Sequence, residues 1–86
     1  MDKYKVIKYP LSTEKAIRLM ESENKLIFVI DNSATKQQVK EAVEELFKAK
    51  VIKVNTVKDI KGGKRAYVKF AFDTPAIDIA TKLGLM

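Results

Sequence analysis

The chain contains no cysteine, histidine or tryptophan, and only three glycines and two prolines among its 86 residues. Without cysteine there are no disulfides or thiolate nucleophiles, and without histidine there is no imidazole for acid–base catalysis or metal binding. No apolar run approaches the roughly 20 residues that span a bilayer, and the N-terminal stretch MDKYKVIKYP lacks the apolar segment of a signal peptide. We therefore expect a cytoplasmic protein with no membrane insertion and no metal ion or cofactor.

Charge is abundant and unevenly distributed. Apolar residues make up 47% of the chain and charged residues 33%, a composition typical of one globular domain over residues 1–86. The net charge is +6, and Lys48–Lys69 alone holds eight basic residues and one acidic residue. The remaining positions hold nine basic and ten acidic residues, so the whole excess belongs to one segment. Localised positive charge of this kind favours a polyanionic partner such as a nucleic acid.

Nothing in the sequence is typical of an enzyme. No two carboxylates are placed as an acid–base pair, and four of the glutamates, Glu14, Glu41, Glu44 and Glu45, fall on predicted helix surfaces where solvent contact explains them. The pair Gly62-Gly63 lacks the spacing of a phosphate-binding loop and is a turn. We therefore predict neither catalysis nor a small-molecule substrate.

The first third of the chain predicts a strand, a helix and a second strand. Lys3–Tyr9 is typical of a short strand that ends at Pro10, and Ser12 or Thr13 can cap a helix that runs to about Glu21. One face of this helix carries the apolar residues Ala16, Ile17 and Met20. The continuous apolar run Lys25–Ile30 then predicts a central strand.

The clearest helix begins after Thr35. Thr35 and Gln38 form a capping-box pattern, and the apolar residues that follow recur at helical spacing. These are Val39, Ala42, Val43, Leu46 and Phe47. The sequence therefore predicts an amphipathic helix that covers a core.

Two runs rich in β-branched and aromatic residues follow. Val51–Lys58 and Lys64–Phe72, joined around Gly62-Gly63, predict a β-hairpin. In the second run, alternation assigns Ala66, Val68, Phe70 and Phe72 to the core face and Arg65, Tyr67, Lys69 and Ala71 to the opposite face. Thr74-Pro75 is then expected to open a short helix through Leu83 that stops at Gly84.

These elements, in the order β-α-β-α-β-β-α, predict an α+β fold. A crossover from Lys25–Ile30 through the long helix, with the hairpin folded back between, gives a split βαβ, ferredoxin-like core. The expected sheet is four-stranded, antiparallel-dominated and ordered 1-2-4-3, with helices packed on it. The position of the last helix is left open.

An RNA-recognition motif is an alternative interpretation. Ala66–Phe70 resembles the latter half of one signature of that family and Ile27–Val29 the start of the other, so that Tyr67 and Phe28 would stack on bases of single-stranded RNA. Against it, the first signature lacks one aromatic residue, a strand and helix precede the core, and no final strand follows. A protein-only interaction module is a third possibility, which the localised charge disfavours.

Five stretches, in this order and spacing, carry a family resemblance: YPLSTEKA at 9–16, ATK at 34–36, AVEELF at 42–47, VNTV at 54–57 and KRAYVK at 64–69. With them the chain resembles the universal large-subunit ribosomal protein twenty-three family, in its short archaeal form. The resemblance implies binding to large-subunit rRNA beside the polypeptide exit tunnel. It also implies two kinds of protein partner, namely ribosomal protein twenty-nine and factors that meet the nascent chain, including signal recognition particle.

Glu14 matches the family position at which a chaperone docks in bacterial members, so the resemblance implies protein docking there. Stabilisation of a helix N-terminus explains the same carboxylate equally well. The loop around Asp59–Gly63 is short compared with the bacterial extension that reaches into the tunnel.

The expected RNA contacts are basic and hydrogen-bonding side chains on the hairpin and at the helix starts. Folded RNA hides its base edges in a deep groove, so recognition of phosphate and shape is expected. The predicted residues are Ser12, Thr13, Lys15, Lys36, Lys53, Asn55, Thr56, Lys58, Lys61, Lys64, Arg65 and Lys69. The role of Tyr67, among them on the strand, is left open.

Overall fold

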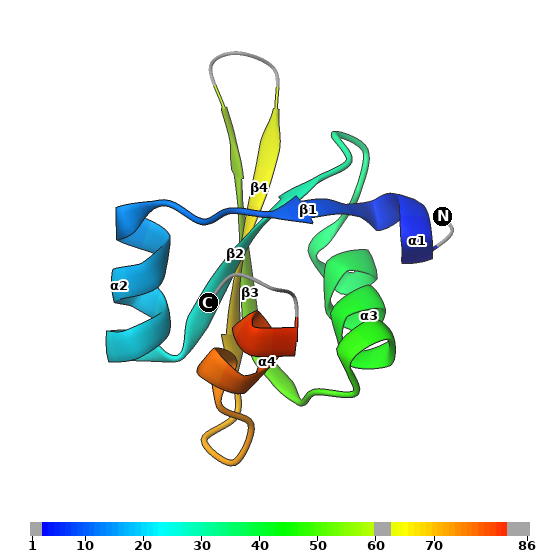
Figure 1. Ribbon diagram of the computed structural model, residues 1–86. Coiled ribbons are helices and arrows are strands. Elements are labelled where there is room, and N and C mark those ends of the chain that lie inside the picture. The colour runs from blue at the N-terminus through cyan, green and yellow to red at the C-terminus, as the bar shows by residue number, and fades with distance from the viewer. Residues whose placement is uncertain (1–2, 60–62, 83–86) are drawn as a thin grey trace.

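The computed structural model describes residues 3–59 and 63–82, and Figure 1 shows the arrangement of its elements. The helices are α1 (Lys3–Val6), α2 (Glu14–Glu23), α3 (Lys36–Phe47) and α4 (Ala76–Lys82). The strands are β1 (Ile7–Pro10), β2 (Lys25–Ile30), β3 (Val51–Lys58) and β4 (Lys64–Phe70).

The strands form one four-stranded sheet in the order β1-β2-β4-β3, as the sequence predicts. Every neighbouring pair is antiparallel. Because β4 runs opposite to both β2 and β3, those two strands are parallel to each other with β4 between them. This is the expected split βαβ arrangement, with α3 as the crossover helix.

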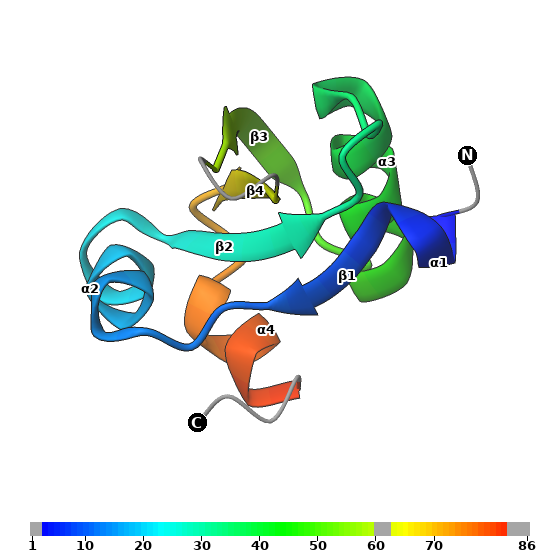
Figure 2. The same cartoon turned by 90° about the horizontal axis from the view of Figure 1, so that it is seen from above.

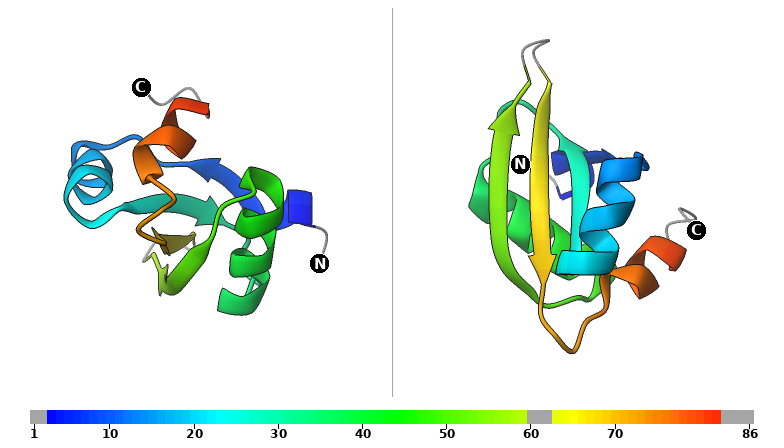
Figure 3. Two further views of the ribbon diagram at one scale, coloured as in Figure 1. Left: turned by 90° about the horizontal axis from the view of Figure 1, so that it is seen from below. Right: turned by 90° about the vertical axis from the view of Figure 1, so that its left-hand side faces the viewer.

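The helices divide unequally between the two faces of the sheet. In the right-hand panel of Figure 3, α3 lies behind the strands, whereas α2 lies in front, beside β2. No helix stands in front of β3 and β4 in that view, so this face is open over the hairpin strands. Figure 2 shows the same separation from above, with α2 and α3 at opposite ends and α4 below β2.

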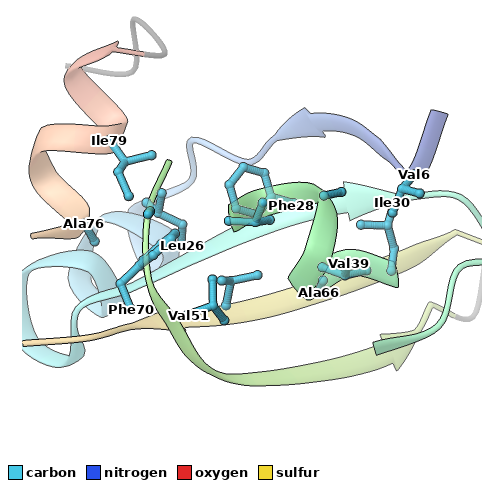
Figure 4. Close-up of a cluster of buried hydrophobic side chains, with 14 of the residues drawn as sticks. Val6, Leu26, Phe28, Ile30, Val39, Val51, Ala66, Phe70, Ala76 and Ile79 are labelled. Carbon is cyan, nitrogen blue, oxygen red and sulfur yellow. The ribbon is translucent and has the colours of Figure 1, made fainter. Parts of the chain in front are cut away.

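The core lies between the sheet and the helices α3 and α4. Figure 4 shows its buried side chains, which come from β2, β3, β4, both of these helices and α1. Phe28 is fully buried, and its ring stacks on that of Phe47 with the ring centroids 5.8 Å apart. The placement of the last helix is thereby settled, since Ala76, Ile79 and Ala80 of α4 are buried in this cluster.

The two longer helices begin at the predicted caps. Thr13 Oγ1 accepts a hydrogen bond from the Ala16 N–H at 3.2 Å, and Thr35 with Gln38 forms a complete capping box. In the turn before α3, Asp31 accepts hydrogen bonds from the side chain and the backbone N–H of Ser33. These two bonds hold the pKa of the Asp31 carboxyl below its ordinary value.

The prediction of a strand over Lys3–Tyr9 is only half right. Lys3–Val6 forms the one-turn helix α1, and β1 begins at Ile7. The turn places Val6, which is 1% exposed, in the core against α3, and the Val6 carbonyl accepts a hydrogen bond from the Asp31 N–H at 2.9 Å. Burial of Val6 therefore outweighs the strand preference of this stretch. One helical turn is too short to produce a periodic pattern in the sequence.

The prediction that β4 extends to Phe72 is wrong. The strand ends at Phe70, the chain turns so that the Thr74 N–H donates to the Ala71 carbonyl at 2.9 Å, and Phe72 becomes fully exposed. Ala71, expected on the basic face, is buried. Alternation fails here because the backbone leaves the pleat.

The apolar face of α2 is narrower than the sequence predicts. Ile17, expected beside Ala16 and Met20, is 36% exposed, whereas those two residues are buried. The predicted end of the last helix, at Leu83 and Gly84, lies outside the described residues, as does Gly62 of the hairpin turn.

Asn24 causes the early end of β4. Its side-chain amide donates to the carbonyls of Phe70, Ala71 and Thr74 at 3.1–3.2 Å, and its Oδ1 accepts from the Ala76 N–H at 2.6 Å. The same residue ends α2 in the left-handed conformation, with φ at 56°. Asn24 therefore joins the end of α2, the end of β4 and the first turn of α4.

Replacement of Asn24 by alanine should destabilise the fold markedly. The change removes all four side-chain bonds and leaves alanine in a left-handed conformation, so we expect a loss of about 3 kcal/mol in the free energy of unfolding. Asn24→Gly should lose about 1 kcal/mol less, because glycine adopts this φ without strain. Urea denaturation followed by circular dichroism measures both. The exposed Asn32→Ala is the control, and equal stabilities of all three variants would contradict this role for Asn24.

Candidate nucleic-acid interface

The hairpin strands β3 and β4 present their second face to solvent, and we call this surface, together with the β2 residues in register beside it, the open face. Antiparallel register aligns its residues in rows across β2, β4 and β3. The rows are Lys25–Lys69–Lys53, Ile27–Tyr67–Asn55 and Val29–Arg65–Val57. Hence an all-lysine row lies at one end of the open face, and an arginine between two valines at the other.

The lysine row is electrostatically unbalanced. Lys25 Nζ lies 3.1 Å from Glu23 Oε1, which compensates one of the three charges. Lys53 and Lys69 are directly opposite each other, and neither forms an ion pair with another residue of the described chain. Like charges in this position repel and destabilise a sheet. An anionic ligand would remove that repulsion.

Tyr67 occupies the middle of the open face. Its register neighbours are Ile27, which α2 buries to 3% exposure, and the partly exposed Asn55. Lys15, in the first turn of α2, places its Nζ 6.0 Å from the centre of the Tyr67 ring. The structure thus brings Lys15, predicted as an RNA contact of the helix start, to the same surface as Asn55 and the lysine row.

Arg65 extends the positive charge toward the hairpin turn. Its guanidinium lies 3.5 Å from Asp59 Oδ2, and both side chains are partly exposed. A contact this long and solvated is weak, so most of the five donors of the guanidinium remain available for phosphate. The predicted residues Lys15, Lys53, Asn55, Arg65 and Lys69 therefore share the open face.

A second group of predicted residues lies on the other face of the hairpin. Lys58 is opposite Lys64, and Thr56 is opposite the buried Ala66. Thr56, Lys58 and Lys64 therefore point to the side of the sheet that α3 covers. Lys64 Nζ donates to the Ala34 carbonyl at 2.7 Å, just before Lys36 at the start of α3. Lys64 thus has a structural contact, and the helix-side group consists of Lys36, Thr56, Lys58 and Lys64.

The remaining predicted residues belong to the start of α2 or are not described. Ser12 is exposed, the Thr13 hydroxyl is used as the helix cap, and Lys61 lies outside the described residues. Glu14 is exposed and pairs with Arg18 at 2.9 Å, one helical turn later. That contact gives the carboxylate a role in the helix itself.

Sequence reasoning missed two residues of this surface. Lys25 belongs to the lysine row, and Tyr9, 55% exposed, is opposite Val29 at the β1 edge of the same face. The period of two along a strand places Lys25 on the same face as Ile27 and Val29, but the continuous apolar run predicts a central strand without distinguishing its two faces. Tyr9 is placed by a register irregularity in β1 that no local pattern predicts.

The RNA-recognition-motif interpretation loses one of its two aromatic residues. Phe28 is fully buried against Phe47 and cannot stack on a base. Tyr67 stays available on the open face. Within the described part of the chain no group of three or more acidic side chains could hold a metal ion, and no described helix is long and apolar enough to cross a membrane.

Removal of one lysine of the opposed pair should stabilise the protein. In Lys53→Thr we expect a gain of about 0.5 kcal/mol in the free energy of unfolding at low salt, because the repulsion from Lys69 disappears. The gain should shrink at high salt, which screens the pair. Denaturant titrations at two salt concentrations measure it. Lys50→Thr removes the same charge outside the sheet, and an equal salt dependence in both variants would argue against the pair.

Comparison with known proteins identifies the family. Residues 5–80 match the protein-family model described as ribosomal protein L23. The large ribosomal subunit protein uL23 of Tetrahymena thermophila is 44% identical over 86 residues, which are 100% of this chain and 57% of that protein. The chain therefore spans a little over half the length of this curated relative. A match to ribosomal proteins also agrees with the prediction that the chain is not an enzyme. By both findings, the chain belongs to the ribosomal protein L23 family.

Proposed function

We propose that the protein is a structural constituent of the large ribosomal subunit and binds large-subunit rRNA through the open face and the hairpin. The observation that carries the proposal is the opposed pair Lys53 and Lys69, which has no counter-charge in the described chain. A sheet that keeps two repelling lysines gains from a phosphate placed between them. Arg65 and Lys15 add charge to the same surface.

The two faces of the hairpin suggest how it meets the RNA. Arg65 and Lys69 point to the open face, whereas Lys58 points to the helix side, so a basic side chain is available on either side of the same two strands. A hairpin of this kind can lie between two phosphate backbones and hold them together. Because these contacts are to phosphate, the recognition is of RNA shape rather than sequence.

The finer assignments follow from the family. We place the protein beside the polypeptide exit tunnel of a cytoplasmic ribosome, next to ribosomal protein twenty-nine, where it helps form the docking site for signal recognition particle or other nascent-chain factors. Glu14 is the candidate docking residue, because its side chain is 83% exposed despite the pairing with Arg18. The archaeal form of the family stays a prediction, since the relative described above comes from a eukaryote.

Charge reversal tests the RNA-binding proposal. Lys53→Glu combined with Lys69→Glu should abolish co-sedimentation with large subunits. On purified large-subunit rRNA the slope of log affinity against log salt should fall by about two, with about one unit for each phosphate that the variant no longer binds. The control is Lys5→Glu with Lys82→Glu, two exposed lysines outside the interface that change the net charge equally.

Equal weakening of RNA binding by both double variants would show a non-specific attraction and contradict the proposed interface. If neither double variant weakened binding, the open face would not be the RNA interface. Thermal denaturation of each variant verifies that the fold is intact before binding is compared.

A further inference from the structure

We propose that the open face also holds one unpaired nucleobase of the RNA, stacked on the ring of Tyr67. This inference rests on the proposed rRNA binding and names what the centre of that surface recognises. The lysine row and Arg65 account for phosphate. These basic residues do not explain why the aromatic ring of Tyr67 lies between Arg65 and Lys69 on β4.

The position of the ring is fixed by its neighbours. Tyr67 lies on β4, which is paired on both sides, and its register partners are Ile27 and Asn55. Ile27 is buried, so Tyr67 has a packed residue beside it on the neighbouring strand β2. Tyr67 itself stays partly exposed, and its hydroxyl has no hydrogen-bond partner in the described chain. A tyrosine held in place and partly exposed, with only the exposed side chain of Lys15 over its ring, offers a stacking platform.

The charged groups around Tyr67 suit a single nucleotide. Lys69 and Arg65 are two residues away on either side along β4, and such residues lie about 7 Å apart on an extended strand. A base on the ring therefore places its sugar–phosphate within reach of long basic side chains at both ends. Lys15 Nζ lies over the ring, 6.0 Å from its centre, so a base stacked on that face displaces this ammonium, which then stays close enough to contact the phosphate of the same nucleotide.

Asn55 gives the platform a polar edge. Its side chain is opposite Tyr67 on β3, partly exposed, and has no hydrogen-bond partner in the described chain. An amide donates and accepts at once, so it can pair with the edge of a stacked base. A base inside an A-form helix is already stacked on both faces, so the nucleotide that stacks on Tyr67 must be unpaired.

A purely structural role for Tyr67 makes different predictions. If the ring only packed beside α2, Tyr67→Leu would alter stability and leave RNA affinity unchanged. If instead it stacks, Tyr67→Leu should bind large-subunit rRNA about tenfold more weakly, the loss of one stacked base, whereas Tyr67→Phe should bind as the unaltered protein does. The salt slope should be the same in all three, because stacking releases no counterions.

Fluorescence supplies a direct readout, because the chain has no tryptophan. Tyr67→Trp introduces a single reporter on the platform, and its emission should be quenched on titration with purified large-subunit rRNA. Phe72→Trp is the matched control: position 72 is fully exposed and lies beyond the end of β4, so its emission should change little.

The outcomes separate this inference from the proposed function. Loss of binding in the lysine double variant, together with full binding by Tyr67→Leu and no quenching in Tyr67→Trp, would overturn the stacking inference alone. Failure of the lysine double variant to weaken binding would overturn the proposed interface. If Tyr67→Leu impaired only retention on intact subunits and not affinity for purified rRNA, the ring would contact a protein, and the inference would also be wrong.

Discussion

The position of α2 depends on the hydrogen bonds of one side chain. Asn24 ends α2, and its amide holds the carbonyls of Phe70, Ala71 and Thr74, while its carbonyl oxygen receives the first N–H of α4. The amide is partly buried, so water compensates only in part for any of these hydrogen bonds that is lost. These contacts fix α2 beside the first half of β2, residues 25–27, with which β1 does not pair. That placement buries Ile27 and brings Lys15 over the sheet, so the candidate RNA surface relies on a residue that does not belong to it.

The open face carries charges that destabilise the sheet but can bind an anionic partner. Lys53 and Lys69, which have no counter-charge among the described residues, face each other across β3 and β4. The core on the opposite side of the same strands, with Val68 and Phe70 buried, supplies the stability that offsets their repulsion. The hairpin is thus stabilised from one side and available for binding on the other. The helix side contributes differently, because Lys64 is already bonded to the backbone before α3. Basic residues that look equivalent in the sequence therefore have separate roles.

Local patterns predict the regular elements well, because caps and periodicity act within a few residues. The capping box at Thr35, the strand Lys25–Ile30 and the sheet order are all confirmed. The errors arise where contacts between distant residues determine the local structure. The end of β4 depends on Asn24, 46 positions earlier. The helix α1 forms where Val6 packs into the core. The candidate site follows the same rule. Strand alternation predicts which face Arg65, Tyr67 and Lys69 share. Cross-strand register places Lys25 and Tyr9 on the same face, and that register cannot be read from the sequence.

The sheet order has a consequence for how the chain is made. The strand that pairs with both β2 and β3 is β4, which leaves the ribosome after the other three described strands. Until residues 64–70 have emerged, β2 lacks its partner on one side and β3 has no partner in the sheet at all. During that time the apolar residues of β2 and β3 are not covered by a complete core. The β2–β4 pairing joins positions far apart in the sequence, which slows folding and favours aggregation. The two strands therefore stay exposed until β4 pairs with both of them, which lengthens the time in which they can meet another chain.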